Sequence, residues 1–373
     1  MGQYRHHDFG QMPIFSMKPL FKNRKLSALE AQYEAHKIAY APIIFQAVRS
    51  MRDLGVLEAL EKAGRGGMDA DSIASRTNLS TYAVDTLLES GLSCGVVEQI
   101  DKQNFALSKI GWFLLNDTMT RINMDYNHYV CYKGLYDLDK SLESEKPEGL
   151  KVFGAQWETL YQALPHLPDE VKNAWYAFDH YYSDGTYPLV LPLVLDRPVG
   201  HLLDIGANVG KFSILAANAD PDLTITMLDL PDQLQNALNN VAAAGLSDRI
   251  RGLALDLLHP QAEIPSGADV YWLSQFLSCF GSEEIISILE RIKTAMRADS
   301  RLFILETCWD RQEHEAAAYS LINTSPYFTC MASGNSKMYS AKALLEHIQA
   351  AGLKLHELHD NLGICHSLFE CRI

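Results

Sequence analysis

The sequence predicts an α/β fold with two parts, a Rossmann-like sheet in the C-terminal half and a smaller helical domain before it. Three observations lead to this prediction. Short apolar runs alternate with helical segments from His201 onward, the pattern of a parallel sheet with helices on both faces. The first of these runs ends in a glycine-bearing turn. The 373 residues also exceed what one compact core usually holds and are enough for two domains.

The N-terminal part predicts an arm, three helices and a hairpin. Residues 1–25 lack an apolar pattern and are expected to form an arm that needs a partner surface to become ordered. Apolar residues at helical spacing cover 26–60, and shorter helices are expected at 69–74 and 81–92. Two short strands within 96–107 flank a polar turn. The order helix, helix, helix, hairpin is that of a winged helix.

For the middle of the chain, the sequence predicts a linker followed by helices. Residues 141–149 are rich in Ser, Glu and Lys and are interpreted as a linker. Helical segments over 157–164 and 170–182 lead into the second half.

The C-terminal half predicts a sheet that is parallel except at its end. Strands are expected over 201–205, 223–228, 250–255, 269–273 and 302–305, and helices over 209–219, 232–244, 283–296 and 341–351. The last two strands, 354–358 and 365–371, are joined only by a short polar turn. So short a connection allows only an antiparallel pair.

Charge and hydropathy exclude several classes of function. A formal charge of −14 is repelled by the phosphate backbone of nucleic acid and by anionic membranes. The helix over 81–92, which would read DNA in a winged helix, contains Asp85 and Glu89 and no Lys or Arg. No apolar run approaches the roughly 20 residues that span a bilayer. The sequence therefore predicts a cytoplasmic protein without a nucleic-acid or membrane partner.

The cysteines and histidines show no ligand spacing. The 7 cysteines are scattered without a CxxC pair, and the 13 histidines include no HExxH motif. This distribution predicts reduced thiols and no metal site.

The turn after the first strand carries the strongest signal for a ligand. It has the pattern D-x-G-x-N-x-G over residues 204–210. A dinucleotide fingerprint would need glycine at 208 and 211, where Asn208 and Lys211 stand, and a P-loop would need Ser or Thr after Lys211, where Phe212 stands. Glycines here let the backbone approach a ligand closely, although such a turn can also simply close a strand–helix junction.

Two further acids end the next two strands. Asp229, followed by Leu230, can accept both hydroxyls of a ribose. Asp256 can accept from an adenine amino group while Leu257 lies against the ring. The three strand ends together form the expected binding crevice of an open α/β sheet.

Residues 201–231, HLLDIGANVGKFSILAANADPDLTITMLDLP, resemble the S-adenosyl-L-methionine (SAM) site of class I methyltransferases. The DLP ending is similar to that of the small-molecule O-methyltransferases typified by the plant caffeic acid and animal hydroxyindole enzymes. The resemblance covers roughly 40–115 and 170–373, including 269–277, DVYWLSQFL, and 301–306, RLFILE. It implies a homodimer that forms through the winged-helix domain, which then does not bind DNA.

The resemblance also implies a division of the chain and a set of cofactor contacts. The expected parts are an arm and dimerisation domain over 1–115, a helical linker that contributes to the substrate pocket over 116–185, and a SAM-binding methyltransferase domain over 186–373. The expected cofactor residues are Asp204, Gly206, Asn208, Gly210, Asp229, Leu230, Asp256, Leu257, Ser274 and Ser183.

The sequence departs from the family at the catalytic position. The family places a Leu-His-Asp-Trp motif after strand four, and its histidine removes the acceptor proton. Here residues 277–280 read Leu-Ser-Cys-Phe, so Ser278 stands in place of the base. Glu306 matches the first of two flanking glutamates, the second falls near Ser336, and a lysine common on strand four is Ser274.

Several ways of reacting without that histidine stay open. A general base contributes about 10²–10⁴-fold, so an acceptor ionised near neutral pH, or an electron-rich carbon, can react without one. Another residue can also substitute, with His180 preferred over His314, although both can be surface histidines. Glu306 either orients the acceptor or caps its strand. The expected catalytic residues are thus His180, Glu306 and Ser278.

An apolar acceptor pocket is expected near these residues. Cys279 has no histidine close in sequence and is interpreted as a pocket-lining thiol rather than a nucleophile. Some of the pocket candidates can be ordinary core residues; they are Tyr182, Phe276, Cys279, Phe280, Tyr319, Phe328 and Tyr339.

The sequence thus predicts a SAM-dependent methyltransferase that acts on a small hydrophobic, aromatic acceptor, at oxygen or at carbon. One alternative is a relative that uses SAM as a non-donating cofactor for hydroxylation, decarboxylation or rearrangement. Another is a winged-helix regulator.

Overall fold

The computed structural model describes residues 20–21, 24–259 and 261–373. Most of the expected N-terminal arm lies outside these residues. The chain divides into two compact units, one over Asn23–Tyr129 and one that contains Val130–Ile373. Among the helices described, none combines the length and apolar character needed to cross a bilayer.

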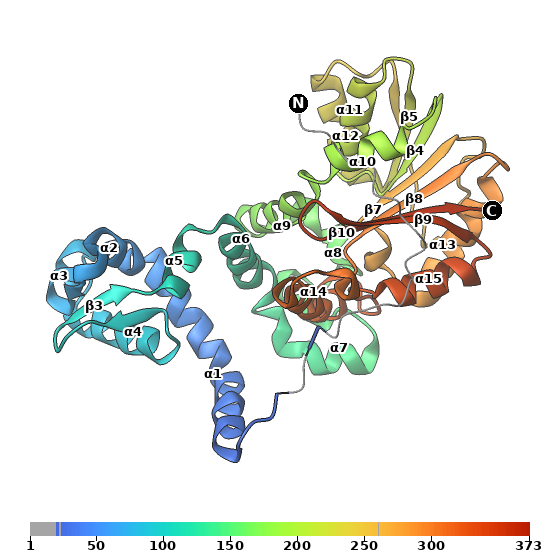
Figure 1. Cartoon of the computed structure of the whole chain (residues 1–373). Coiled ribbons are helices and arrows are strands. Elements are labelled where there is room, and N and C mark those ends of the chain that lie inside the picture. The colour runs from blue at the N-terminus through green and yellow to red at the C-terminus, as the bar shows by residue number, and fades with distance from the viewer. Residues whose placement is uncertain (1–19, 22–23, 260) are drawn as a thin grey trace, which may run out of the picture. The chain divides into compact units, whose positions relative to one another are not determined.

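The first unit has the predicted order of helices and hairpin (Figure 1). Its helices are α1 (Ala28–Asp53), α2 (Val56–Ala63), α3 (Ala70–Thr77), α4 (Thr81–Ser93), α5 (Lys109–Asn116) and α6 (Thr118–Tyr126). Strands β1 (Met68–Asp69), β2 (Val97–Gln99) and β3 (Asn104–Leu107) form an antiparallel sheet in the order β1-β3-β2. The apolar stretch expected as one helix over 26–60 breaks at Gly55, whose φ of +82° is left-handed and ends α1.

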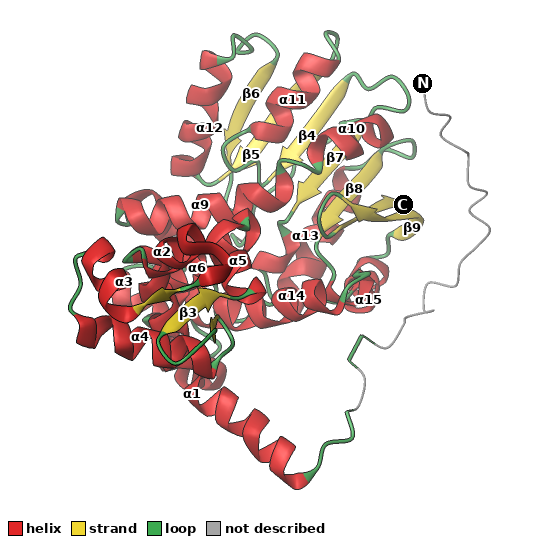
Figure 2. Cartoon of the chain, turned by 60° about the vertical axis from the view of Figure 1, so that its left-hand side comes forward, coloured by secondary structure: helices red, strands yellow, loops and turns green. Residues whose placement is uncertain are grey.

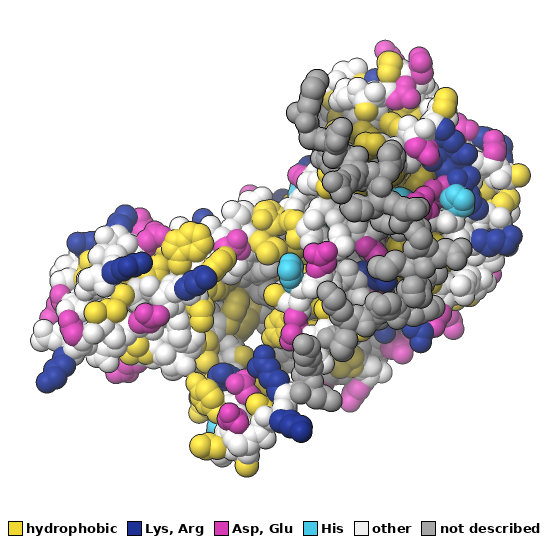
Figure 3. Space-filling model, in the orientation of Figure 1, with side chains coloured by type: hydrophobic (Ala, Val, Ile, Leu, Met, Phe, Trp, Pro, Cys, Tyr) yellow, Lys and Arg dark blue, Asp and Glu magenta, His cyan; other side chains and the backbone are white. Residues whose placement is uncertain are grey.

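The described residues leave part of the apolar surface of helix α1 exposed. Figure 3 shows hydrophobic side chains among charged ones along it. The large exposed hydrophobic residues of α1 are Leu29, Tyr33, Ile38, Tyr40 and Ile43. Single exposed apolar residues are common, but several on one helix are typical of a surface that meets a partner.

The stretch expected as a linker over 141–149 is helical, so that interpretation was wrong. It contains the end of α7 (Leu138–Ser144) and the start of η4 (Glu148–Phe153). Ser141 is fully buried, and its Oγ accepts a hydrogen bond from the Glu148 backbone N–H at 3.0 Å. A Cβ on Gly149 would lie 2.4 Å from the Gly134 carbonyl oxygen. Small residues therefore serve close packing here, which composition alone cannot distinguish from a linker.

Helices continue from this stretch to the sheet. They are η3 (Gly134–Asp137), α8 (Leu160–Ala163), η5 (Leu164–His166), α9 (Asp169–Ser183) and α10 (Tyr187–Val194).

A seven-stranded sheet forms the centre of the second unit, in the order β6-β5-β4-β7-β8-β10-β9. The strands are β4 (His201–Ile205), β5 (Thr224–Asp229), β6 (Ile250–Ala254), β7 (Val270–Ser274), β8 (Arg301–Glu306), β9 (Lys354–Leu362) and β10 (His366–Arg372). Strands β4 to β8 pair in parallel, whereas β10 is antiparallel to both β8 and β9. The α/β class with an antiparallel end is confirmed.

Helices cover both faces of this sheet (Figure 2). They are α10 and the helices α11 (Lys211–Ala219), α12 (Pro231–Ala243), α13 (Ser282–Ala295) and α15 (Ala341–Ala350). Helix α14 (Glu315–Tyr327) lies in the connection between β8 and α15. Alternation along β4 places Leu203 and Ile205 in the core with α13 and α15. It places Leu202 in the core with α10, α11 and α12 on the opposite face. Strands buried on both faces are the mark of a parallel sheet.

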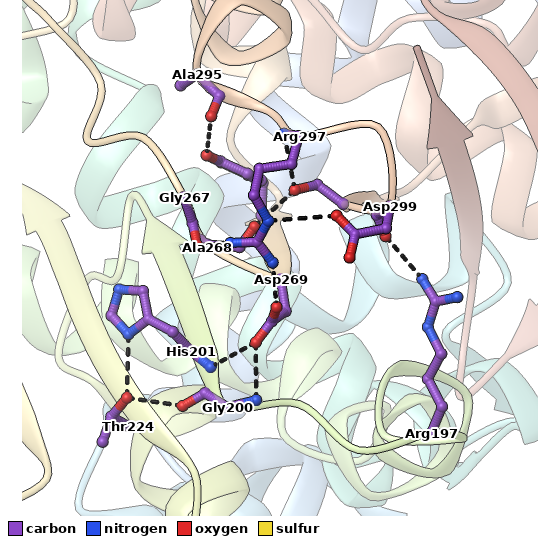
Figure 4. Close-up of polar contacts among 12 residues, drawn as sticks. Arg197, Gly200, His201, Thr224, Gly267, Ala268, Asp269, Ala295, Arg297 and Asp299 are labelled. Carbon is purple, nitrogen blue, oxygen red and sulfur yellow. Dashed lines mark hydrogen bonds and ion pairs between the residues drawn. The ribbon is translucent and has the colours of Figure 1, made fainter.

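A polar cluster joins the strands at their amino ends (Figure 4). One oxygen of Asp269, just before β7, accepts hydrogen bonds from the backbone N–H groups of Gly200 and His201 at 2.8 and 2.9 Å. Its other oxygen pairs with Arg297, which also donates to Asp299. Burial alone raises the pKa of Asp269, but the hydrogen bonds from His201 and Arg297 outweigh it and hold the pKa below its ordinary value.

This cluster leads to a stability prediction for Asp269→Ala. The variant loses two backbone hydrogen bonds to a charged group, so the free energy of unfolding at pH 7 should fall by about 1–3 kcal/mol. Asp299→Ala is the matched control on the same arginine; its side chain is 77% exposed, so its loss should stay below about 0.5 kcal/mol. Urea denaturation of the full chain measures both.

The pH dependence of that loss follows from the lowered pKa. A carboxylate whose folded pKa lies below its unfolded value stabilises the fold above pH about 4 and loses that contribution as the pH falls further. The difference between wild type and Asp269→Ala should therefore shrink from pH 7 to pH 3. A difference that stays constant would contradict this account.

Candidate functional site

The turn from β4 to α11 is held in a left-handed conformation by three residues. Gly206, Asn208 and Gly210 have φ values of +77°, +52° and +80°. A Cβ at position 206 would lie 2.2 Å from Cδ2 of Phe276, so only glycine fits there. The Gly206 N–H donates to the Leu228 carbonyl at 2.8 Å, which ties the turn to the end of β5.

Asp229, at the end of β5, lies directly against this turn, as the sequence predicted. One carboxylate oxygen accepts from the Asn208 N–H at 2.8 Å, and the other accepts from the Leu230 N–H at 2.7 Å. Burial raises the pKa of Asp229 to about 6 despite these two hydrogen bonds. The carboxylate keeps further lone pairs, because an ionised Asp accepts about four hydrogen bonds.

Asp204 lies beneath the turn rather than at its surface. It is buried, and its carboxylate accepts from the Ser213 hydroxyl at 2.6 Å. Burial raises the pKa of Asp204 to about 7. This hydrogen bond joins β4 to α11, so Asp204 stabilises the turn from within the fold.

The third strand end is more open. Asp256 is exposed, and its carboxylate accepts from the Leu258 N–H at 2.9 Å. Leu257 is buried in the apolar core, and its carbonyl accepts from Arg291 at 2.6 Å. Contacts of these two residues with an adenine ring stay a prediction.

The sequence analysis missed a carboxylate in the middle of the site, Asp179 on α9. One oxygen accepts from Asn208 Nδ2 at 2.9 Å, and the other accepts from Gln275 Nε2 at 3.2 Å. Gln275 follows β7 and also has a left-handed φ, +50°. Its Oε1 lies 2.9 Å from Nε2 of His366 on β10, and Nδ1 of that ring lies 3.1 Å from the Thr186 hydroxyl.

Two neighbouring titratable groups on α9, Asp179 and His180, have pKa values shifted in opposite directions. Burial raises the pKa of Asp179 to about 7, although Lys211 acts against this. Lys211 is paired with Asp184 at 2.6 Å. The expected base, His180, has a pKa lowered to about 4, chiefly by burial. Its Nε2 is buried without a hydrogen-bond partner among the described residues and lies 3.9 Å from Asp179.

Glu306 holds the turn that carries Ser278. Glu306 ends β8, is buried, and accepts from the N–H groups of Leu277 and Ser278 at 2.8 and 3.3 Å. It therefore caps the short helix η6 (Leu277–Cys279), where the resemblance implies that the family carries its base. Burial raises the pKa of Glu306 to about 7, against the hydrogen bonds from these backbone groups.

The surroundings of Cys279 keep its thiol protonated and therefore unreactive. Burial raises the pKa of its thiol, and the Tyr161 hydroxyl is its hydrogen-bonding neighbour. A thiol that is not ionised is a poor nucleophile, which agrees with its interpretation as a lining residue. Tyr161 was not anticipated, because no pattern connects residue 161 with residue 279.

The aromatic residues expected in the acceptor pocket divide into two groups. The Phe276 and Phe280 rings meet edge to face at 4.8 Å, and the Tyr339 hydroxyl donates to the Phe280 carbonyl at 2.8 Å. Phe328 is buried, and Tyr182 packs against Phe178 on α9. By contrast, Tyr319 is 62% exposed on α14, so the structure does not bring it into a buried lining.

The remaining expected residues also have defined places. The Ser274 hydroxyl donates to Tyr187 at 3.3 Å, and the buried Ser183 hydroxyl donates to the Asp179 carbonyl at 3.1 Å. His314 is exposed. Within the described ranges, no group of three or more His, Cys, Asp or Glu side chains is arranged to hold a metal ion.

Two families match the chain. Residues 32–105 match the Dimerisation2-like domain, and residues 187–353 match the O-methyltransferase domain. The mitomycin biosynthesis 6-O-methyltransferase of Streptomyces lavendulae is 30% identical over 271 residues, 72% of this chain and 75% of that protein. The L-tyrosine C(3)-methyltransferase of the same organism is 25% identical over 317 residues, 84% of this chain and 85% of that protein.

Solved structures share the fold. Mitomycin 7-O-methyltransferase MmcR has a TM-score of 0.69 at 21% identity, with 92% of this chain and 97% of that chain covered. The O-methyltransferase NcsB1 from neocarzinostatin biosynthesis, solved with SAM and 2-hydroxy-5-methyl naphthoic acid, has a TM-score of 0.63 at 20% identity. That match covers 88% of this chain and 95% of NcsB1.

The raised pKa of Glu306 predicts how stability changes with pH. A carboxyl whose folded pKa is about 7 stabilises the fold below its unfolded value, about 4.3, and loses that contribution as the pH rises through 7. Glu306→Gln, which cannot ionise, should therefore gain about 1–3 kcal/mol of unfolding free energy relative to wild type between pH 5 and pH 7.5.

Chemical denaturation of the full chain at the two pH values measures this gain. Glu283→Gln, an exposed position at the start of α13, should show no such change. Parallel pH dependence of wild type and Glu306→Gln would show that Glu306 ionises normally, against this account.

Proposed function

Because the chain belongs to the O-methyltransferase family and is a SAM-dependent methyltransferase, we propose that its acceptor is a small aromatic compound with a hydroxyl group. The methyl group goes to that oxygen or to an electron-rich ring carbon. The observation that carries SAM binding in this proposal is the carboxylate of Asp229, fixed against the glycine turn where two parallel strands end. Such strand ends are where open α/β sheets bind ligands.

The residues around the turn fit SAM. Asp229 has lone pairs left for the two ribose hydroxyls. The Asn208 Oδ1 atom is buried and has no hydrogen-bond partner among the described residues, so it is ready to accept from a ligand. Bound SAM supplies an electrophilic methyl group on a sulfonium. Ser183, Gly206 and Gly210 are proposed to contact its methionine end, and Asp256 its adenine.

The neighbouring aromatic residues support an aromatic acceptor. Trp175 on α9 donates to the Tyr327 hydroxyl at 2.8 Å, both side chains being buried, and Tyr161 lies near Cys279. Aromatic side chains favour flat aromatic ligands through stacked and edge-to-face contacts. The tyrosine methyltransferase among the relatives is consistent with such an acceptor.

The methyl transfer itself requires mainly alignment. Displacement at a sulfonium is a single step, so the enzyme must hold the acceptor atom in line with methyl and sulfur. Glu306 positions the turn at Ser278. We propose that Ser278 replaces the family's histidine, as the sequence pattern suggests. His180 is proposed to border the acceptor.

We also infer that the chain forms a homodimer through its first unit. The match to the Dimerisation2-like domain and the exposed hydrophobic residues of α1 support this. The acidic helix α4 argues against DNA as a partner. The absence of any disulfide among the cysteines supports a cytoplasmic location.

Replacement of Asp229 tests the cofactor site. Asp229→Ala loses the ribose contact and the clamp on Asn208, so SAM affinity measured by calorimetry should fall at least 100-fold, by about 3 kcal/mol. Asp232→Ala is the matched control in the next turn of chain, and its side chain is 68% exposed. Equal affinities of the two variants would refute the placement of the site.

Product analysis separates methyl transfer from the second candidate function. The proposed replacement of the histidine by Ser278 also fits a relative that keeps SAM intact while it assists hydroxylation, decarboxylation or rearrangement. Formation of one S-adenosylhomocysteine per product supports methyl transfer. Product without S-adenosylhomocysteine would favour the second function.

A further inference from the structure

The Asp179 carboxylate lies where the two halves of the site meet. Asn208 reaches it from the turn after β4, which belongs to the cofactor side. Gln275 reaches it from the turn after β7, which leads directly into η6 and Cys279. Strands β4 and β7 are neighbours in the sheet, so the carboxylate stands over the gap between the cofactor turn and the acceptor side.

The carboxylate is held rigidly and keeps room for another partner. Each of its oxygens accepts from one side-chain amide, which leaves lone pairs on both. The Gln275 amide is oriented in turn by His366, whose ring contacts Thr186. Within the described ranges, no lysine or arginine forms an ion pair with Asp179. The side chain is 22% exposed, and a carboxylate that is mostly withdrawn from water without a paired cation is costly. Functional sites are where such groups are kept.

We propose that Asp179 accepts the proton of the acceptor's hydroxyl group during methyl transfer, in place of the family's histidine. This inference rests on the proposed function. The acceptor oxygen forms its new bond to the methyl carbon while the carbon–sulfur bond breaks and leaves its electron pair on sulfur. The hydroxyl proton moves to a carboxylate oxygen of Asp179 and is later released to solvent. Charge and atoms balance without a further reactant.

Asp179 is a stronger base than its neighbour His180. Its pKa is about 7, against about 4 for the histidine. A base with a pKa near the working pH is also the most effective one.

Several titratable groups act on this carboxylate, and each element around it contributes. They are Lys211 on α11, Asp184 just after α9, His180 and Tyr176 on α9, Tyr161 on α8, Tyr187 on α10, Cys279 in η6 and, through Gln275, His366 on β10. The burial of His366 lowers its pKa to about 3, so it stays neutral. The positive charge of bound SAM acts to lower the pKa of Asp179 below that of the free enzyme.

Two phenols of different acidity test the proposal. The probes are 4-methylphenol, which ionises at about pH 10 as tyrosine does, and 4-nitrophenol, which is far more acidic and already about half ionised at neutral pH. S-Adenosylhomocysteine formation gives kcat/KM for each. Asp179→Asn should lower kcat/KM for 4-methylphenol about 10²–10⁴-fold but for 4-nitrophenol less than about 5-fold, because that acceptor needs no base. Asp169→Asn, 87% exposed on the same helix, should match wild type.

The pH profile distinguishes a base from a positioning residue. With 4-methylphenol, kcat/KM of the wild type should rise with pH through one ionisation at or below about 7, and this rise should be lost in Asp179→Asn. Asp179→Glu keeps a carboxylate, so its kcat/KM should still rise with pH. Gln275→Leu removes only a contact that positions Asp179, so its kcat/KM should also still rise with pH. Calorimetric SAM binding confirms that each variant is folded.

Other outcomes overturn the proposal. Equal losses with both phenols, or a rise with pH that persists in Asp179→Asn, would mean that Asp179 only positions other groups. Turnover by Asp179→Asn at the wild-type rate would exclude the residue while leaving the proposed function intact. A wild-type enzyme that binds SAM but methylates neither phenol would contradict the proposed function and the inference together.

Discussion

The Asp179 carboxylate, partly buried between two side-chain amides, is the contact on which the arrangement of the site depends. Asn208 donates to it from the turn after β4, and Gln275 donates from the turn after β7, while α9 supplies the carboxylate itself. Because a partly buried carboxylate needs hydrogen-bond donors in place of the water it has lost, both amides turn their N–H groups toward it. The cofactor turn and the acceptor side are therefore fixed relative to each other by a single group.

The two residues that donate these amide hydrogen bonds also have left-handed backbone conformations. Asn208 and Gln275 are left-handed at φ +52° and +50°, which costs about 1–2 kcal/mol for a residue with a side chain. Both follow neighbouring parallel strands, and β4 is the strand from which the order of the sheet runs outward in both directions. This switch point is where α/β sheets open a crevice. The two left-handed residues and the carboxylate with a raised pKa therefore lie where a ligand is expected. Functional sites commonly contain such groups.

The fold was largely predictable because its signals are local. Alternating strands and helices, the glycine turn and the short final hairpin each follow from neighbouring residues, and Asp229 was placed correctly because it ends a recognisable strand. The linker over 141–149 was wrong because small residues pack closely there. Asp179, Gln275 and His366 were missed because residues about ninety positions apart meet only in the folded chain. Tyr319 is exposed, which its aromatic character alone did not indicate, and its place in the acceptor pocket stays a prediction.

The central claim is that one carboxylate from α9 faces both the methyl donor and the acceptor. A crystal structure of the full chain with S-adenosylhomocysteine and 4-nitrophenol tests it most directly. The account predicts that an oxygen of Asp179 lies within hydrogen-bond distance of the phenol oxygen, and that Asp229 contacts the ribose hydroxyls. A phenol oxygen bound to a histidine, with Asp179 facing away from the ligand, would contradict it.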